Sequence, residues 1–179
     1  MLHRHKFTKI VQALFEIVLF ADHPAQGISV RAADNRDCEA VTKLVFAILA
    51  EHGLTGDSES TDADLSDIEN NYQARGGFFD VFETSSGEIV GSIGIYPLDK
   101  ETCELRKMYF ATAIRGRGLG RAALKYAIER ARVLGFKRIV LETSSRLEVA
   151  RHLYLSFGFQ AITSDHLASR ADEAYALDL

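Results

Sequence analysis

The chain of 179 residues has the length of one domain with a short extension. Its hydrophobic fraction of 47% and charged fraction of 26% are typical of a soluble globular protein, and they exclude a disordered, collagen-like or low-complexity chain. The two cysteines, Cys38 and Cys103, are too few for a disulfide scaffold and belong to no close Cys/His cluster. We therefore expect no metal site and a reducing, cytoplasmic location.

The N-terminal segment, residues 1–26, is predicted to form an amphipathic helix and a linker ahead of a single domain over 27–179. Apolar residues recur at helical spacing within 10–21. A basic start followed by this apolar run also resembles a signal peptide, but Gln12 and Glu16 interrupt the run. The run is also too short for a membrane span.

The first part of the domain is predicted to contain one strand and two helices. Residues 28–31 alternate between apolar and polar side chains, which indicates a strand. A helix is expected over 36–52, capped by Asp34 or Asn35. A weaker helix is expected over about 61–76, with one apolar face formed by Leu65, Ile68 and Tyr72.

The second part of the domain predicts an antiparallel meander followed by alternating helices and strands. Strands are expected at 78–83, 89–96, 103–110, 139–141, 159–163 and 174–179, and helices at 118–134 and 147–157. The run at 139–141 is continuously apolar, as in a buried central strand. This order predicts an α/β fold, in which helices flank a mixed, mostly antiparallel twisted sheet of six to seven strands.

The formal net charge of −4 hides a separation of charge along the chain. Residues 51–69 contain seven acids and no Lys or Arg, whereas residues 105–138 contain ten bases and one acid. The basic stretch suits an anionic ligand and the acidic stretch a cationic one, unless both are only solvated surfaces. The acidic balance, and the apolar residues between the bases, argue against nucleic-acid binding.

A glycine-rich loop, Arg-Gly-Arg-Gly-Leu-Gly at 115–120, lies between a predicted strand and a long helix. Glycines let backbone N–H groups approach a ligand, and the helix N-terminus adds unpaired N–H groups and a positive dipole. A phosphate or pyrophosphate is the expected guest, with cationic donors from Arg115, Arg117 and Arg121. The loop matches neither the P-loop nor the dinucleotide fingerprint. A basic turn without a ligand is the alternative.

Two segments together resemble the signatures of the GNAT superfamily of acetyl-CoA-dependent N-acetyltransferases. The first is the strand 104–110 followed by the glycine loop. The second is residues 150–159, which read Ala-x-x-Leu-Tyr-x-x-x-Gly-Phe. The resemblance implies a GNAT-like fold, acetyl-CoA as co-substrate, and an amine acceptor.

The resemblance also implies roles for particular residues. In the family, the pyrophosphate of CoA lies on the glycine loop and the pantetheine arm along the preceding strand. The cofactor site would then consist of Met108, Phe110, Arg115, Gly116, Arg117, Gly118, Leu119, Gly120 and Arg121. The thioester would lie where that strand diverges from the strand at 139–142. Tyr154 matches the family's usual general acid, which protonates the departing CoA thiolate.

Physical chemistry supports that role for Tyr154, because a phenol has a pKa of about 10 and a thiol one of about 8.5. The alternative is that Tyr154 only packs in an apolar helical stripe. The amine must attack unprotonated, so a base or a relaying water is needed. Glu104 is the candidate base, unless it is only an exposed strand residue paired with Arg106 or Lys107.

The sequence therefore predicts an N-acetyltransferase that transfers acetyl directly from acetyl-CoA to an amine of a small molecule or peptide. We expect no metal, no nucleic acid and no membrane, and a homodimer is possible. The acidic stretch at 51–69 would attract a cationic amine. One alternative is a non-catalytic acetyl-CoA-binding regulatory module, because Leu147 replaces a polar residue of many relatives. Another is a phosphate- or nucleic-acid-binding module.

Overall fold

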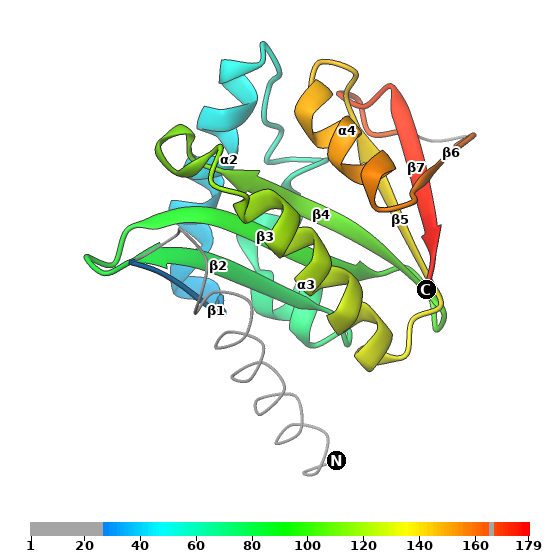
Figure 1. Cartoon of the computed structure of the whole chain (residues 1–179). Coiled ribbons are helices and arrows are strands. Elements are labelled where there is room, and N and C mark those ends of the chain that lie inside the picture. The colour runs from blue at the N-terminus through cyan, green and yellow to red at the C-terminus, as the bar shows by residue number, and fades with distance from the viewer. Residues whose placement is uncertain (1–26, 165–166) are drawn as a thin grey trace.

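The computed structural model describes residues 27–164 and 167–179, which build one seven-stranded sheet with helices on both faces (Figure 1). The strand order is β1-β2-β3-β4-β5-β7-β6. The strands are β1 (Ile28–Ala32), β2 (Phe78–Thr84), β3 (Ile89–Pro97), β4 (Thr102–Phe110), β5 (Arg138–Thr143), β6 (Gln160–Ile162) and β7 (Glu173–Asp178). The predicted N-terminal helix lies outside the described residues.

Neighbouring strands pair antiparallel except β4 and β5, which run parallel. The predicted meander is present, with β2, β3 and β4 joined by short turns. The continuously apolar run at 139–141 is the centre of β5, which has neighbours on both sides. The prediction of a mixed, mostly antiparallel sheet flanked by helices is thus confirmed.

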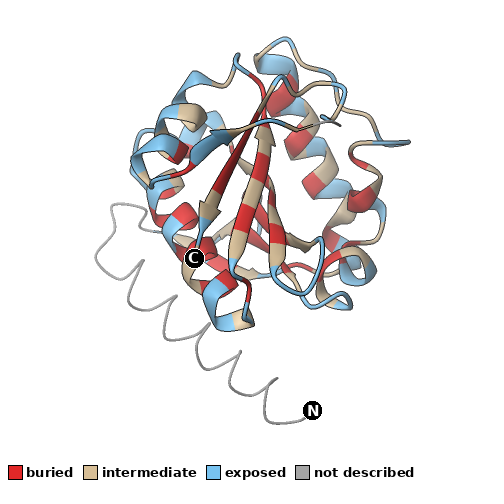
Figure 2. Ribbon diagram, turned by 90° about the vertical axis from the view of Figure 1, so that its right-hand side faces the viewer, coloured by how far each residue is buried: buried red, intermediate tan, exposed pale blue. Residues whose placement is uncertain are grey.

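In the described part of the chain, three α-helices cover the sheet, namely α2 (Cys38–Glu51), α3 (Leu119–Leu134) and α4 (Glu148–Ser156). Figure 1 shows α2 behind the sheet and α3 across its front, with α4 beside β5 and β7. Along β4 and β5, buried residues alternate with less buried ones (Figure 2), whereas β2 and β3 are buried over most of their length. No helix in the described part of the chain is long and apolar enough to cross a membrane.

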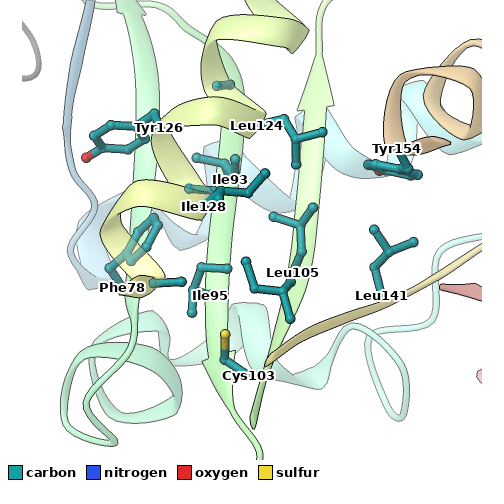
Figure 3. Close-up of a cluster of buried hydrophobic side chains, with 14 of the residues drawn as sticks. Phe78, Ile93, Ile95, Cys103, Leu105, Leu124, Tyr126, Ile128, Leu141 and Tyr154 are labelled. Carbon is teal, nitrogen blue, oxygen red and sulfur yellow. The ribbon is translucent and has the colours of Figure 1, made fainter. Parts of the chain in front are cut away.

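Each face of the sheet carries its own apolar core. The α2 face holds Val41, Val45 and Leu49 against Phe79 and Val81. The α3 face holds the larger cluster. Figure 3 shows it extending from Phe78 of β2 and Tyr126 of α3 to Tyr154 of α4. The two cores fix the sheet between the helices, so the strand edges that reach the site are held from both sides.

The two ends of α3 follow from glycines at positive φ. Gly118, at φ 80°, is the N-cap, and Gly135, at φ 97°, is the C-cap. Glycine takes this left-handed conformation without the steric cost that a Cβ imposes. The helix predicted over 36–52 instead opens with a 3-10 turn, η1 (Asn35–Asp37), capped by Asp34.

The helix expected over about 61–76 is wrong as an α-helix. The segment forms a 3-10 turn, η2 (Ala63–Ser66), and a π-helical turn, η3 (Glu69–Gln73). Its apolar residues are nevertheless buried, as predicted: Leu65, Ile68 and Tyr72 are at most 1% exposed. In place of a regular helix, the segment turns Asp62 and Asp64 inward to meet Lys107 of β4.

Candidate active site

The parallel strands β4 and β5 pair over only three residues each, ending at Glu104 opposite Val140. Beyond this point the strands no longer pair, and a cavity of about 1000 Å³ is lined by both of them. Its walls include consecutive residues of β4 and of the C-terminal end of β5. Successive side chains of a strand point to opposite faces, so the cavity is reached from both faces of the sheet.

A bulge in β4 determines on which side of the sheet each of its side chains lies. Tyr109 pairs with Ser92 and Arg106 with Gly94, so β4 contains one residue more than β3 over this stretch. The extra residue is Lys107, at φ 54°, whose carbonyl accepts a hydrogen bond of 2.6 Å from the buried Ser92 hydroxyl. A bulge of this kind interrupts the alternation of side chains. As a result, Leu105, Met108 and Phe110 join the α3 core, whereas Arg106, Lys107 and Tyr109 lie on the α2 side.

The cavity on the α3 face ends at the glycine loop and the start of α3. No side chain caps this helix, and its first turn contains no acid. The N–H of Ala122 makes the first intrahelical bond, to the carbonyl of Gly118, so the preceding N–H groups have no intrahelical partner. Such a helix N-terminus attracts an anion. The predicted residues Leu119 and Gly120 line the cavity here, as do Met108 and Phe110.

Arg115, predicted as a cationic phosphate donor, contacts two other parts of the protein. Its Nε donates to the carbonyl of Phe110 at 2.7 Å, and its Nη1 lies 2.8 Å from Oε2 of Glu51 on α2. Both contacts hold the glycine loop against the end of β4 and against α2. Arg115 therefore braces the loop, although it still lines the cavity.

The other two predicted arginines, Arg117 of the loop and Arg121 of α3, are not among the residues that line the cavity. Arg121 donates to Oγ of Ser156 at 3.1 Å, and its guanidinium carbon lies 5.1 Å from the ring centroid of Phe157. These contacts tie α3 to α4. Arg117 is exposed. The predicted basic loop is thus brought together around one helix N-terminus, with two of its three arginines engaged by protein groups.

Tyr154 of α4 lies at the junction of the core and the cavity. It is only 7% exposed, belongs to the α3-side core and packs on Phe159 at 5.8 Å between ring centroids. It also lines the cavity, and Figure 3 shows it beside Leu105 of β4 and Leu141 of β5. Burial raises the pKa of its phenol, and the nearby Tyr109 adds to that effect. Tyr154 is therefore protonated at neutral pH.

The α2 side of the split contains a buried ion-pair cluster of Asp62, Asp64, Arg106, Lys107 and Arg170. The Nζ of Lys107 lies 2.5 Å from Asp62 and 3.1 Å from Asp64. Arg170, from the loop before β7, donates twice to Asp62, at 2.7 Å each. Burial alone raises the pKa of Asp62, but Arg170 and Lys107 outweigh it and hold that pKa below its ordinary value. Asp62 is thus ionised, and the cluster joins three distant segments.

Glu104 lines the cavity next to this cluster. Its Oε2 accepts hydrogen bonds from Nε and Nη2 of Arg106, at 2.8 and 2.5 Å. The predicted pairing with Arg106 is therefore present, but the carboxylate is largely buried rather than exposed. Burial raises its pKa above the ordinary value, and Arg106 offsets this only in part. A carboxylate with a raised pKa is a better base near neutral pH.

The acidic stretch at 51–69 does not present most of its charge to the cavity. Asp62 and Asp64 are matched by the buried cluster, and Glu51 is matched by Arg115. Asp67 accepts hydrogen bonds within its own turn and from Asn35. The stretch therefore contributes structure more than a free negative surface.

Sequence reasoning missed three residues of the site, namely Lys107, Glu142 and Arg170. For Lys107 a signal existed: two adjacent polar residues, 106 and 107, interrupt an alternating strand, as a bulge requires. Glu142 and Arg170 gave no local signal, because their places depend on strand pairing and on a loop. In the described ranges, no group of three or more His, Cys, Asp or Glu residues is arranged to hold a metal ion.

Comparison with known proteins agrees with this geometry. The family described as "Acetyltransferase (GNAT) family" matches residues 44–159. An Escherichia coli K12 protein named uncharacterized N-acetyltransferase YjgM is 42% identical over 132 residues, which cover 71% of this chain and 78% of that protein. A crystal structure of an acetyltransferase from Streptococcus agalactiae superposes with a TM-score of 0.77 at 27% identity, covering 86% of this chain and 99% of the other.

A third comparison concerns a structure with a bound cofactor. YncA, a putative acetyltransferase from Salmonella typhimurium solved with acetyl-CoA, superposes with a TM-score of 0.65 at 24% identity. The match covers 86% of this chain and 94% of that one, and it supports the fold. The family match and the E. coli relative together show that this chain belongs to the GNAT family of acetyltransferases. It is an N-acetyltransferase by class.

Proposed function

We propose that the chain transfers the acetyl group of acetyl-CoA directly to the amine of a small molecule or peptide. One observation carries the proposal. A single cavity passes through the split between β4 and β5, with a helix N-terminus at one end and the buried carboxylate of Glu104 at the other. That arrangement suits a phosphate-bearing thioester on the α3 face and an amine on the α2 face.

The cofactor would occupy the α3 side of the cavity. Its pyrophosphate would accept hydrogen bonds from the N–H groups of the loop at 116–120, which lack intrahelical partners at the start of α3. Its pantetheine arm would lie along Met108 and Phe110, where β4 no longer pairs with β5. The acetyl-CoA bound in the structure of YncA, which shares this fold, supports the same cofactor here.

Two residues would move the protons of the reaction. Glu104, directly or through a water, would take the proton that the acceptor ammonium must lose before its nitrogen attacks the thioester carbonyl. The C–N bond forms, the C–S bond breaks, and Tyr154 would give its proton to the departing sulfur. A protonated phenol with a raised pKa is a donor throughout the neutral range, and it recovers its proton from solvent.

The described cysteines favour direct transfer over an acetylated thiol intermediate. Cys103 faces the α3 core, and burial raises the pKa of its thiol to about 12. Cys38 lies at the start of α2. Neither residue lines the cavity, so neither is placed to attack the thioester.

The test measures the melting temperature with and without acetyl-CoA, followed by release of CoA thiol with a panel of amines. A ligand at 100 times its Kd stabilises the native state by about 2.7 kcal/mol, so the melting temperature should rise by about 5–10 °C. ATP and dephospho-CoA serve as controls. A specific shift with CoA release supports the proposal. A shift without CoA release for any amine favours a regulatory module, and no shift contradicts both.

A further inference from the structure

The carboxylates on the α2 side of the split are not equivalent. Three of them, Asp62, Asp64 and Glu104, each have a cationic partner among Lys107, Arg106 and Arg170. One further carboxylate lines the cavity on this side, and no described Lys or Arg forms an ion pair with it.

That carboxylate belongs to Glu142. The residue follows Leu141 of β5, whose side chain lies in the α3-side core, so Glu142 points to the other face, as Glu104 does on β4. It lines the cavity and is partly buried. Its one described hydrogen bond comes from the backbone N–H of Ala168 to Oε2, at 2.8 Å, and no described Lys or Arg lies within ion-pair distance.

Glu142 also stands close enough to Glu104 to influence it. Its negative charge contributes to the raised pKa of Glu104, after burial and against the effect of Arg106. The two carboxylates therefore flank the point where β4 and β5 separate. Both of them line the cavity.

We propose that Glu142 binds the acceptor's ammonium group, and that the acceptor therefore enters as a cationic amine. This inference rests on the proposed function. A cation is the ligand that balances the unmatched charge, and an ammonium donates up to three hydrogen bonds to carboxylate oxygens. The bond from Ala168 holds Glu142 in place on one oxygen. Glu104, already held by Arg106, then takes the proton.

The different roles of Glu142 and Glu104 have a chemical reason. Glu142 keeps a polar N–H partner and partial exposure, which suits a carboxylate that binds a cation. A carboxylate that removes the proton works best with a raised pKa, as Glu104 has. Amines that carry no positive charge near neutral pH, or acceptors with a carboxylate beside the amine, would gain nothing from Glu142.

The test compares cationic and neutral probes of matched size on the CoA-loaded protein. Methyl-, butyl- and benzylammonium are paired with the corresponding alcohols, and binding is measured by calorimetry. The variant is Glu142→Gln, because its amide oxygen still accepts from Ala168. The matched control is Glu148→Gln, which removes another cavity-lining carboxylate at the exposed start of α4.

The wild type and the control should prefer the best-fitting cation over its alcohol, and Glu142→Gln should weaken that cation's binding by about 10- to 100-fold. With an amine found in the CoA-release panel, the variant should raise KM by a similar factor and change kcat much less. The inference is overturned if the wild type binds the cations and their alcohols equally well. It is also overturned if Glu142→Gln keeps the preference for the cation. Binding of acetyl-CoA, measured separately, tells this outcome apart from failure of the proposed function.

Discussion

The two faces of β4 present two different kinds of binding surface. On the α3 face, the cavity is lined by apolar side chains and by backbone N–H groups at a helix start. On the α2 face, it is lined by charged side chains of β4, β5 and the loop before β7, and Lys107 and Arg170 among them pair with Asp62, 45 and 108 residues away along the chain. A backbone site depends on glycines and turns, whereas a side-chain site depends on which distant residues meet.

This difference teaches where specificity resides. Backbone groups recognise a phosphate without requiring particular side chains, so the α3 face suits a cofactor common to a family. The α2 face is built from individual side chains, and each of them can be substituted separately. The acceptor should therefore be read from the charges around Asp62, Glu104 and Glu142, and the cofactor from the glycine loop.

The largest expected effect comes from the residue that lies between the two faces. Tyr154→Phe should lower kcat by about 10²- to 10⁴-fold, because it removes the proton donor to the leaving thiolate. Affinity for acetyl-CoA, measured by calorimetry, should change little. Tyr175→Phe, another buried tyrosine whose hydroxyl bonds to Glu173, is the control. Equal turnover of Tyr154→Phe and the wild type would exclude this role.

The next effect concerns stability and tests the ion-pair cluster on the α2 face. Lys107→Ala leaves the buried carboxylates of Asp62 and Asp64 without their shared cation, which should cost about 3–5 kcal/mol. The melting temperature should fall by about 6–20 °C. Arg36→Ala, which removes a fully exposed partner of Asp34, should leave it nearly unchanged. A small loss for Lys107→Ala would mean that the cluster does not hold the α2 face together.

A smaller effect concerns the pH dependence of kcat/KM. The rate should fall as pH decreases through the pKa of Glu104, because the protonated carboxyl accepts no proton. Since burial raises that pKa, this acid limb should lie above the ordinary value of 4.5. Glu104→Gln should lower kcat by about 10²-fold and remove the limb. An unchanged profile in the variant would assign the base to another group or to water.

The smallest effect isolates the glycine loop. Gly116, at φ 75°, and Gly135, at φ 97°, both have open space where a Cβ would lie. Changing either to Ala should cost about 1–2 kcal/mol from backbone strain alone. Only Gly116 lines the cavity, so only Gly116→Ala should also weaken acetyl-CoA binding. If the two variants bind acetyl-CoA equally well, the loop conformation does not matter for the cofactor.

The sequence predicted best those elements whose information is local. The meander and α3 follow from strand alternation, helical periodicity and terminal glycines. The segment at 61–76 was predicted as a regular helix because its apolar spacing is helical. Its actual turns depend on Lys107 and Arg170, which lie 45 and 108 residues from Asp62. Local patterns do not contain that information.

The candidate site divides in the same way. Tyr154 and the glycine loop stand in recognisable motifs, and the structure brings both to one cavity. Arg115 was expected among the cationic donors to a phosphate, and no local pattern indicated its ion pair with Glu51, 64 residues away. Glu142 lies in an ordinary strand sequence. It reaches the cavity because β5 stops pairing with β4 at Val140, two residues before Glu142.

The split between β4 and β5 also has a consequence for the order of events in a catalytic cycle. Because the cavity is reached from both faces of the sheet, one substrate does not have to leave before the other arrives. The rate law should therefore contain a term for both substrates bound together. Initial rates plotted as double reciprocals, at several fixed acetyl-CoA concentrations, should give lines that intersect rather than run parallel.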